Sequence, residues 1–277
     1  SSIACFLAAV SIFLKNKKKF NGSLSFLITG DEEAQAINGT KKVVDYLIKK
    51  KEKIDFCIVG EPTNPNKLGE MIKIGRRGSL SCNLELQGTQ GHVAYPHLSN
   101  NPINSLITIC EKLKKKPLDK GNKHFQPSNL EFTRIDVDNK AHNVIPARVK
   151  TQFNIRYNNF HTAVSLKKMI NAEIKSICKK NKIKYKIEFL TSGNSFLTKP
   201  GATIQMAKKV INKITKIKPV FSTTGGTSDA RFIKKISPCL EFGLVNKTMH
   251  RVDESVSLPD LKKLKKIYLS IIENYFI

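Results

Sequence analysis

The sequence predicts an α/β domain that is interrupted by an inserted α+β domain. Two segments, 24–29 and 54–59, are mainly apolar and flank an amphipathic segment at 40–51. This strand–helix–strand order is typical of a sheet covered on both faces. Residues 79–86 instead alternate polar and apolar side chains, as in a sheet with one solvated face. We therefore expect a catalytic domain formed by 1–77 and 192–277, and an inserted domain at 78–191.

The first predicted element is a buried helix at residues 2–16. Its apolar run at 3–14 is shorter than the roughly 20 residues that span a bilayer. A basic cluster at 15–19 follows the run, whereas a secretory signal peptide carries its positive charges before the apolar region. The sequence therefore predicts no membrane partner and a cytoplasmic location.

The inserted domain is predicted to be a ferredoxin-like unit, in which the order is strand, helix, strand, strand, helix, strand. Its strands are expected at 79–86, 129–135, 149–157 and 184–190, with helices at 102–115 and 162–180. The catalytic domain resumes with helices at 203–214, near residue 228 and at 258–275, and with a strand at 238–242.

The charge balance is strongly positive, with 48 Lys and Arg against 22 Asp and Glu and a net charge of +26. Only seven of the basic residues are arginines and no tryptophan is present, whereas nucleic-acid recognition relies on arginine and aromatic stacking. We expect solvated surface lysines that steer small anionic substrates, and no nucleic-acid partner. The six scattered cysteines contain no CxxC pair, which favours free thiols.

Three adjacent acids, Asp31, Glu32 and Glu33, follow the apolar segment 24–29. Open α/β sheets place their sites at such strand ends, and a divalent cation is a common reason for carboxylates to gather. Because neighbouring residues of a strand face opposite ways, one acid would bind the ion while the other handles a proton. A helix start rich in acids is an equally good interpretation of this stretch alone.

Glu61 and His250 are the next candidates. Glu61 follows the segment 54–59, so parallel neighbouring strands would bring it near Glu33, although an isolated glutamate before proline is usually a turn residue. His250 would supply the nitrogen that zinc favours beside carboxylates, although an isolated histidine is more often structural.

Two turns could hold anions. Gly226 and Thr227 belong to a glycine turn before a helix, where backbone N–H groups face a ligand; a simple helix cap is the alternative, with Asp229 and Arg231 as a structural pair. Arg76 lies in a basic turn that could clamp a carboxylate or serve as a hinge.

Seven motifs together resemble the succinyl-diaminopimelate desuccinylase branch of the M20 metallopeptidase family. Each motif is weak by itself, but they follow the family's order over the whole chain. They are Leu27-Ile28-Thr29-Gly30-Asp31-Glu32-Glu33-Ala34, Val59-Gly60-Glu61-Pro62, Gly75-Arg76-Arg77-Gly78-Ser79, Gln90-Gly91-His92-Val93-Ala94-Tyr95-Pro96-His97, Asn143-Val144-Ile145-Pro146, Gly225-Gly226-Thr227-Ser228-Asp229 and Thr248-Met249-His250.

The resemblance implies a role for each candidate residue. Glu32 would be the general base, Glu33 and His250 the ligands of one zinc, and Glu61 a ligand of the second. His92 would reach the partner's site in a homodimer formed through the inserted domain, and Asn143 would assist it. The implied contacts to substrate carboxylates are Arg76, Arg156, Gly226, Thr227 and Asn246. The intact enzyme would carry two Zn²⁺ per subunit, with Co²⁺ as an alternative.

The implied fold is a mixed-sheet, zinc-peptidase-like catalytic domain. The implied reaction is hydrolysis of N-succinyl-LL-2,6-diaminopimelate to succinate and LL-2,6-diaminopimelate in lysine biosynthesis. The family's upstream His-x-Asp and metal-bridging Asp are not found in this sequence, so we expect an N-terminally truncated fragment that hydrolyses little by itself. A related deacetylase or aminoacylase, and a non-catalytic dimerisation module, are the alternatives.

Overall fold

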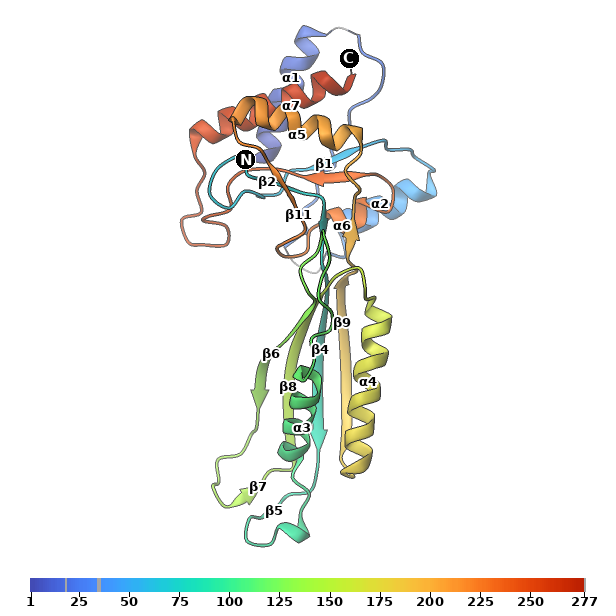
Figure 1. The fold of residues 1–277 in the computed structure, drawn as a ribbon, viewed down its shortest axis with the longest axis vertical. Coiled ribbons are helices and arrows are strands. Elements are labelled where there is room, and N and C mark those ends of the chain that lie inside the picture. The colour runs from blue at the N-terminus through green and yellow to red at the C-terminus, as the bar shows by residue number, and fades with distance from the viewer. Residues whose placement is uncertain (18, 34–35, 277) are drawn as a thin grey trace. The chain divides into compact units, whose positions relative to one another are not determined.

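The computed structural model describes residues 1–17, 19–33 and 36–276, which form two compact units (Figure 1). Unit 1 comprises Ser1–Arg76 and Leu197–Ile277, and unit 2 comprises Arg77–Phe196. The short strands β3 (Gly75–Arg76) and β10 (Phe196–Leu197) pair with each other.

Unit 1 is built on a four-stranded mixed sheet with the order β1-β12-β2-β11. β1 and β12 are parallel, β12 and β2 are antiparallel, and β2 and β11 are parallel. The predicted mixed α/β architecture is therefore confirmed. The strands are β1 (Cys57–Val59), β2 (Met71–Lys73), β11 (Val220–Ser222) and β12 (Cys239–Glu241).

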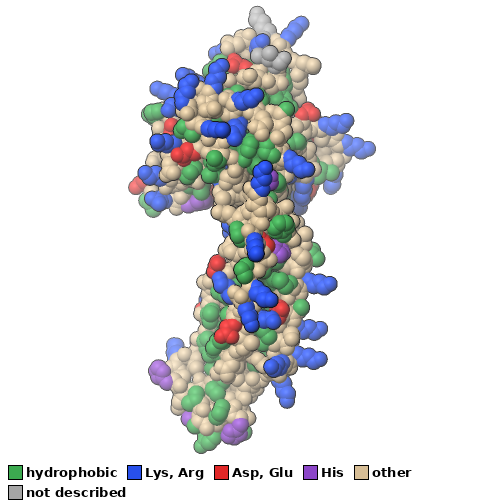
Figure 2. Space-filling view, in the orientation of Figure 1, with side chains coloured by type: hydrophobic (Ala, Val, Ile, Leu, Met, Phe, Trp, Pro, Cys, Tyr) green, Lys and Arg blue, Asp and Glu red, His purple; other side chains and the backbone are tan. Residues whose placement is uncertain are grey.

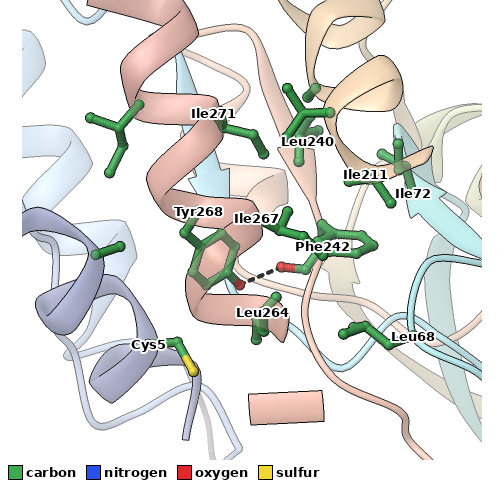
Figure 3. Packing of buried hydrophobic residues seen from close by; sticks show 14 of the residues in the cluster. Cys5, Leu68, Ile72, Ile211, Leu240, Phe242, Leu264, Ile267, Tyr268 and Ile271 are labelled. Carbon is green, nitrogen blue, oxygen red and sulfur yellow. Dashed lines mark hydrogen bonds between the residues drawn. The ribbon is translucent and has the colours of Figure 1, made fainter. Parts of the chain in front are cut away.

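Three long helices, α1, α5 and α7, contribute most of the core of unit 1. The close view in Figure 3 shows Tyr268 of α7 donating a hydrogen bond of 2.7 Å to the carbonyl of Phe242. Ile72 of the sheet is fully buried in the same cluster. The helices are α1 (Ser2–Asn16), α5 (Ala202–Thr215) and α7 (Leu258–Phe276), and unit 1 also holds α2 (Thr40–Lys49) and α6 (Ala230–Ile233).

The strand predicted at 24–29 is wrong, because the segment has no regular secondary structure. Phe26, Leu27 and Ile28 are 40%, 42% and 61% exposed. A continuous apolar run predicts a strand buried between layers, but a strand also needs a neighbour to pair its backbone groups. Within the described part of the chain, no strand pairs with this segment.

Unit 2 has an antiparallel sheet with the strand order β6-β8-β4-β9. Along the chain the order is strand, helix, strand, strand, helix, strand, which is the ferredoxin-like arrangement. Alternate residues of β4, such as Leu80 and Leu84, are buried in the helix-covered core, whereas Ser81 and Asn83 lie on the polar face. The elements are β4 (Gly78–Gln87), α3 (Pro102–Lys114), β6 (Asn129–Asp136), β8 (Arg148–Tyr157), α4 (Ala163–Lys180) and β9 (Lys184–Gly193).

Several short elements complete the described residues. In unit 2, β5 (Gly91–His92) pairs antiparallel with β7 (Val144–Ile145), and η1 (Pro96–Leu98) is a single 3₁₀ turn. All six cysteines are free thiols. Among the helices that the structure describes, none combines the length and apolarity needed to cross a bilayer. Lys and Arg side chains are spread over the visible surface of both units, with few acidic ones between them (Figure 2).

Candidate functional site

Four carboxylates of unit 1 lie close enough to interact electrostatically, namely those of Glu32, Glu33, Glu61 and Asp229. Burial raises the pKa of Glu32 to about 7, and the negative charges of Glu61, Glu33 and Asp229 contribute to this rise, while Arg231 acts in the opposite direction. Burial is also the main reason that the pKa of Glu61 is raised. The structure thus brings the predicted base and two predicted ligands into one anionic region.

Glu33 and His250 form the closest contact between predicted metal ligands. The Nε2 atom of His250 lies 3.9 Å from Oε2 of Glu33, and both side chains are largely exposed. His250 has a φ of 61°, in the left-handed region that non-glycine residues rarely adopt. Such conformations are found disproportionately at functional sites.

The donor chemistry of this region fits a divalent metal ion, although it does not complete a cage. A carboxylate and an imidazole are a ligand pair that zinc accepts, and a cation would offset the repulsion among the acids. Among the described residues, however, no three His, Cys, Asp or Glu side chains lie close enough to hold one ion. Glu33 and His250 are brought together. Glu61 lies close enough to Glu33 for the negative charge of Glu33 to raise its pKa.

The sheet of unit 1 places Glu61 two residues after the end of β1. In the β1–β12 pairing, Val59 lies opposite Glu241, the last residue of β12. The chain then passes Gly243, where an added Cβ would collide with the carbonyl oxygen of Glu61. Glycine is therefore required at this position for the segment after β12 to pass so close to Glu61.

Arg76 forms a buried ion pair that the sequence did not predict. Its Nε lies 3.0 and 3.1 Å from the two carboxylate oxygens of Glu241, its Nη2 also donates to that carboxylate, and its Nη1 donates to the carbonyl of Thr224 at 3.2 Å. Ser228 donates to the same carboxylate at 2.7 Å. Both Arg76 and Glu241 are nearly inaccessible. Arg76 was predicted to bind a carboxylate, and the carboxylate that it binds in the structure is that of Glu241.

The glycine turn lies against this ion pair. Gly225 has a φ of 99°, and a Cβ there would lie 2.6 Å from Nη1 of Arg76, so only glycine fits. Gly226 is exposed with open space around it, and Thr227 is half-buried. Asn246, farther along the chain, donates its backbone N–H to the carbonyl of Asn64 at 2.9 Å.

Lys73 is a second buried cation beside Arg76. It is 5% exposed, and its Nζ donates to Oγ1 of Thr224 at 2.5 Å and to Oγ of Ser222 at 3.2 Å. Burial lowers its pKa from 10.5 to about 8; the charge of Arg76 contributes to this lowering, and Glu241 opposes it. The sequence did not predict that Lys73 is buried, because a three-residue strand is too short to show a pattern of burial.

Lys73 should make the free energy of unfolding rise with pH between about 8 and 10.5. In this range the folded state has lost the proton of Lys73 while the unfolded state still binds it, so raising the pH favours folding by up to about 3 kcal/mol. The gain is measured as the difference between wild type and Lys73→Met in urea unfolding at pH 7.5 and 10, because buried thiols with a raised pKa, such as Cys82 and Cys239, lower the stability of both proteins over this range. Lys218→Met, at an exposed lysine of unit 1, should respond to pH as the wild type does. An equal response to pH in all three proteins would contradict the assignment.

Unit 2 holds the other predicted site residues, His92, Asn143 and Arg156. His92 and Asn143 are neighbours at the β5–β7 pair, where the backbone N–H of Val93 donates to the carbonyl of Asn143 at 3.0 Å. Nδ1 of His92 accepts the backbone N–H of Ala94 at 3.0 Å, which leaves the proton of a neutral imidazole on Nε2. Arg156 lies at the opposite end of the unit's sheet, on β8.

Comparison with known proteins relates the whole chain to one family. Residues 1–274 match the family described as Peptidase family M20/M25/M40. The sequence is 64% identical over 276 residues to a protein of Pelagibacter ubique (strain HTCC1062) named succinyl-diaminopimelate desuccinylase, which covers 100% of this chain and 72% of that protein. A protein of the same name from Rickettsia bellii (strain RML369-C) is 48% identical over 271 residues, or 98% of this chain and 69% of that one.

Two solved structures share the fold at low sequence identity. The aminopeptidase PepT from Bacillus cereus ATCC 10987 superposes with a TM-score of 0.79 at 19% identity, over 98% of this chain and 69% of that one. The M20 family metallo-carboxypeptidase Sso-CP2 from Sulfolobus solfataricus gives 0.74 at 17% identity, over 99% and 75%.

Proposed function

The chain belongs to peptidase family M20/M25/M40, and from this premise we propose that it hydrolyses N-succinyl-LL-2,6-diaminopimelate to succinate and LL-2,6-diaminopimelate. The reaction belongs to lysine and diaminopimelate biosynthesis. One structural observation carries the proposal, namely the 3.9 Å approach of His250 to Glu33 beside Glu32. It occurs in a chain that is 64% identical to a relative named for this activity.

Hydrolysis in this family depends on a bound metal, and the acidic region of unit 1 is where it would bind. Glu33 and His250 would hold one ion and Glu61 the other, with two Zn²⁺ per subunit and Co²⁺ as an alternative. When bound, the metal would polarise the amide carbonyl and make a water molecule more acidic.

The protein's own side chains would transfer the proton and stabilise the developing negative charge. Glu32 would accept a proton from the attacking water and return it to the leaving amine nitrogen. His92 would donate from Nε2 to the oxygen on which negative charge develops, since its Nδ1 is already occupied by the N–H of Ala94. A donor in that place contributes about 3 kcal/mol of transition-state stabilisation. Asn143, adjacent to His92, would assist.

The substrate's carboxylates need separate contacts. The proposed contacts are the backbone N–H of Gly226, the hydroxyl of Thr227, the amide of Asn246 and the guanidinium of Arg156. Arg76 would contribute through the ion pair with Glu241 that supports the glycine turn. The net charge of +26 favours the approach of such an anionic substrate.

We also propose that the protein forms a homodimer through unit 2 and works in the cytoplasm. His92 would then serve the site of the partner subunit. The support is the exposure of His92 and its neighbours at the β5–β7 pair, where the side chains are free to meet another surface.

The substrate assignment is tested by supplying Zn²⁺ and comparing the N-succinyl and N-acetyl forms of the same diamino acid. We expect slow turnover, because Glu33, Glu61 and His250 are few ligands for two ions, and at least a tenfold preference for the succinyl form, or about 1.4 kcal/mol. A preference for the acetyl form would favour the deacetylase alternative. No zinc bound and no turnover of either compound would favour a non-catalytic dimerisation module.

A further inference from the structure

Two free cysteines of unit 1, Cys57 and Cys239, lie side by side on neighbouring strands. Cys57 begins β1 and Cys239 begins β12, and the register of this parallel pair places them directly opposite each other. The backbone N–H of Cys57 donates to the carbonyl of Pro238 at 3.0 Å, which fixes the register. Neighbouring strands lie about 4.8 Å apart and residues opposite each other project from the same face, so the two thiols are neighbours.

The thiols lie on the face of the sheet that α6 covers. Successive side chains of a strand point to opposite faces, and the next residues, Ile58 and Leu240, pack in the core that holds α1, α5 and α7. On the other face, Sγ of Cys239 lies 3.8 Å from the carbonyl oxygen of Ala230 in α6 and 3.9 Å from Oγ1 of Thr198. The sulfur atoms are thus surrounded by the protein without a strong polar partner for Cys239.

One of the two thiols is accessible from solvent. Cys239 is 1% exposed, whereas Cys57 is half-buried. β1 is the end strand of the sheet that the described residues of unit 1 form, so Cys57 stands at the sheet edge. An ion that binds Cys57 there reaches the neighbouring sulfur of Cys239 without crossing the core.

The local charges keep both cysteines as thiols until an ion binds. Burial raises the pKa of Cys57 to about 11 and that of Cys239 to about 12, and the charge of Cys57 contributes to the second rise. Thiols of this kind are protonated at neutral pH and unreactive toward oxidants. The positive charge of Lys234 acts in the opposite direction on Cys239, so a cation is near enough to offset negative charge on the sulfurs.

We propose that Cys57 and Cys239 bind one Cu(I) ion between their sulfur atoms. Soft thiolate ligands select Cu(I), which is satisfied by two sulfurs in a line. Among the described residues, no third His, Cys, Asp or Glu side chain joins the pair, so a two-coordinate ion fits it better than zinc, which takes four ligands in structural sites. Binding replaces the two S–H bonds by two S–Cu bonds and releases both protons to solvent. The inference does not depend on the proposed reaction.

The test is the transfer of Cu(I) to the whole chain from its coloured complex with bicinchoninate, without oxygen. The loss of colour measures both the stoichiometry and the affinity. The wild type should take one equivalent, and Cys57→Ser and Cys239→Ser should each weaken this binding at least tenfold. The matched control is Cys5→Ser, because Cys5 is also buried in unit 1 but packs in the core on the opposite side of the sheet; its binding should change less than twofold.

Three results would overturn the site. They are no transfer of Cu(I) to the wild type, equal binding in all four proteins, and a loss of binding in Cys57→Ser that Cys239→Ser does not share, which would reduce the pair to a single thiol. Because Cys239 is buried and its substitution could disturb the fold, Cys57→Ser at the partly exposed position provides the independent variant.

Two further measurements identify the ligands. X-ray absorption of the bound copper should show sulfur neighbours only, and a nitrogen neighbour would place the ion on a histidine and contradict the proposal. Cu(I) should raise the melting temperature of the wild type, because it binds the folded state, and should leave that of Cys57→Ser unchanged. An equal rise in both proteins would show that the ion binds elsewhere.

Discussion

Glu241→Gln is expected to destabilise unit 1 by about 3–5 kcal/mol. The substitution would leave the guanidinium of Arg76 buried at 8% exposure without its counter-charge, beside the second cation Lys73. The bidentate pair would also lose an oxygen that accepts from Ser228. Urea unfolding followed by circular dichroism, with the midpoint and slope reported separately, measures the loss.

Two variants make this test specific. Glu85→Gln removes a carboxylate whose cations lie 3.9 Å away in solvent, and it should cost less than about 1 kcal/mol. The double variant Arg76→Met with Glu241→Leu removes both charges, and it should recover most of the stability that Glu241→Gln loses. A cost for Glu241→Gln no larger than that of Glu85→Gln would show that the pair does not support the fold.

Glu32→Gln is expected to reduce succinyl hydrolysis by a factor of about 10² to 10⁴ while zinc binding remains. Glutamine keeps the size of the side chain but cannot accept the proton from water. Product formed over long incubation with excess Zn²⁺, quantified by mass spectrometry, gives the rate ratio. Calorimetric titration with Zn²⁺ gives the affinity independently of turnover.

The adjacent acid provides the contrast. Glu33→Gln should weaken zinc binding at least tenfold, because it removes the carboxylate next to His250, and activity should fall with it. Glu52→Gln, at an exposed acid, should change neither quantity. If Glu32→Gln weakened zinc binding as much as Glu33→Gln, then Glu32 would be a ligand and its role as the base would be wrong.

Periodicity predicted the longer elements because each carries enough residues to show a repeat. The predicted helices at 2–16 and 162–180 correspond to α1 and α4 within one residue. The alternation at 79–86 marks β4, with its core-facing leucines and its polar open face. Strands of two or three residues, such as β2 and β11, are too short for any repeat to be visible.

The remaining errors involve partners that are distant in the sequence. An apolar run at 24–29 looks like a strand, but pairing depends on a neighbour that the run itself does not encode. Arg76 looked like an open clamp because Glu241 lies far along the chain, inside an apolar strand. A single acid in such a strand is a usable signal, since a buried carboxylate needs a cation.

The division of unit 1 into two chain segments has a consequence for its biosynthesis. Cys5 of α1 donates a hydrogen bond to the carbonyl of Leu261 in α7, so α1 must wait for more than 240 further residues to be made before it finds that partner. Unit 2 is one continuous stretch of chain and leaves the ribosome earlier. Since domains fold as units during translation, unit 2 should reach its native state first, while α1 stays without its partner α7 until residues 258–276 have been made.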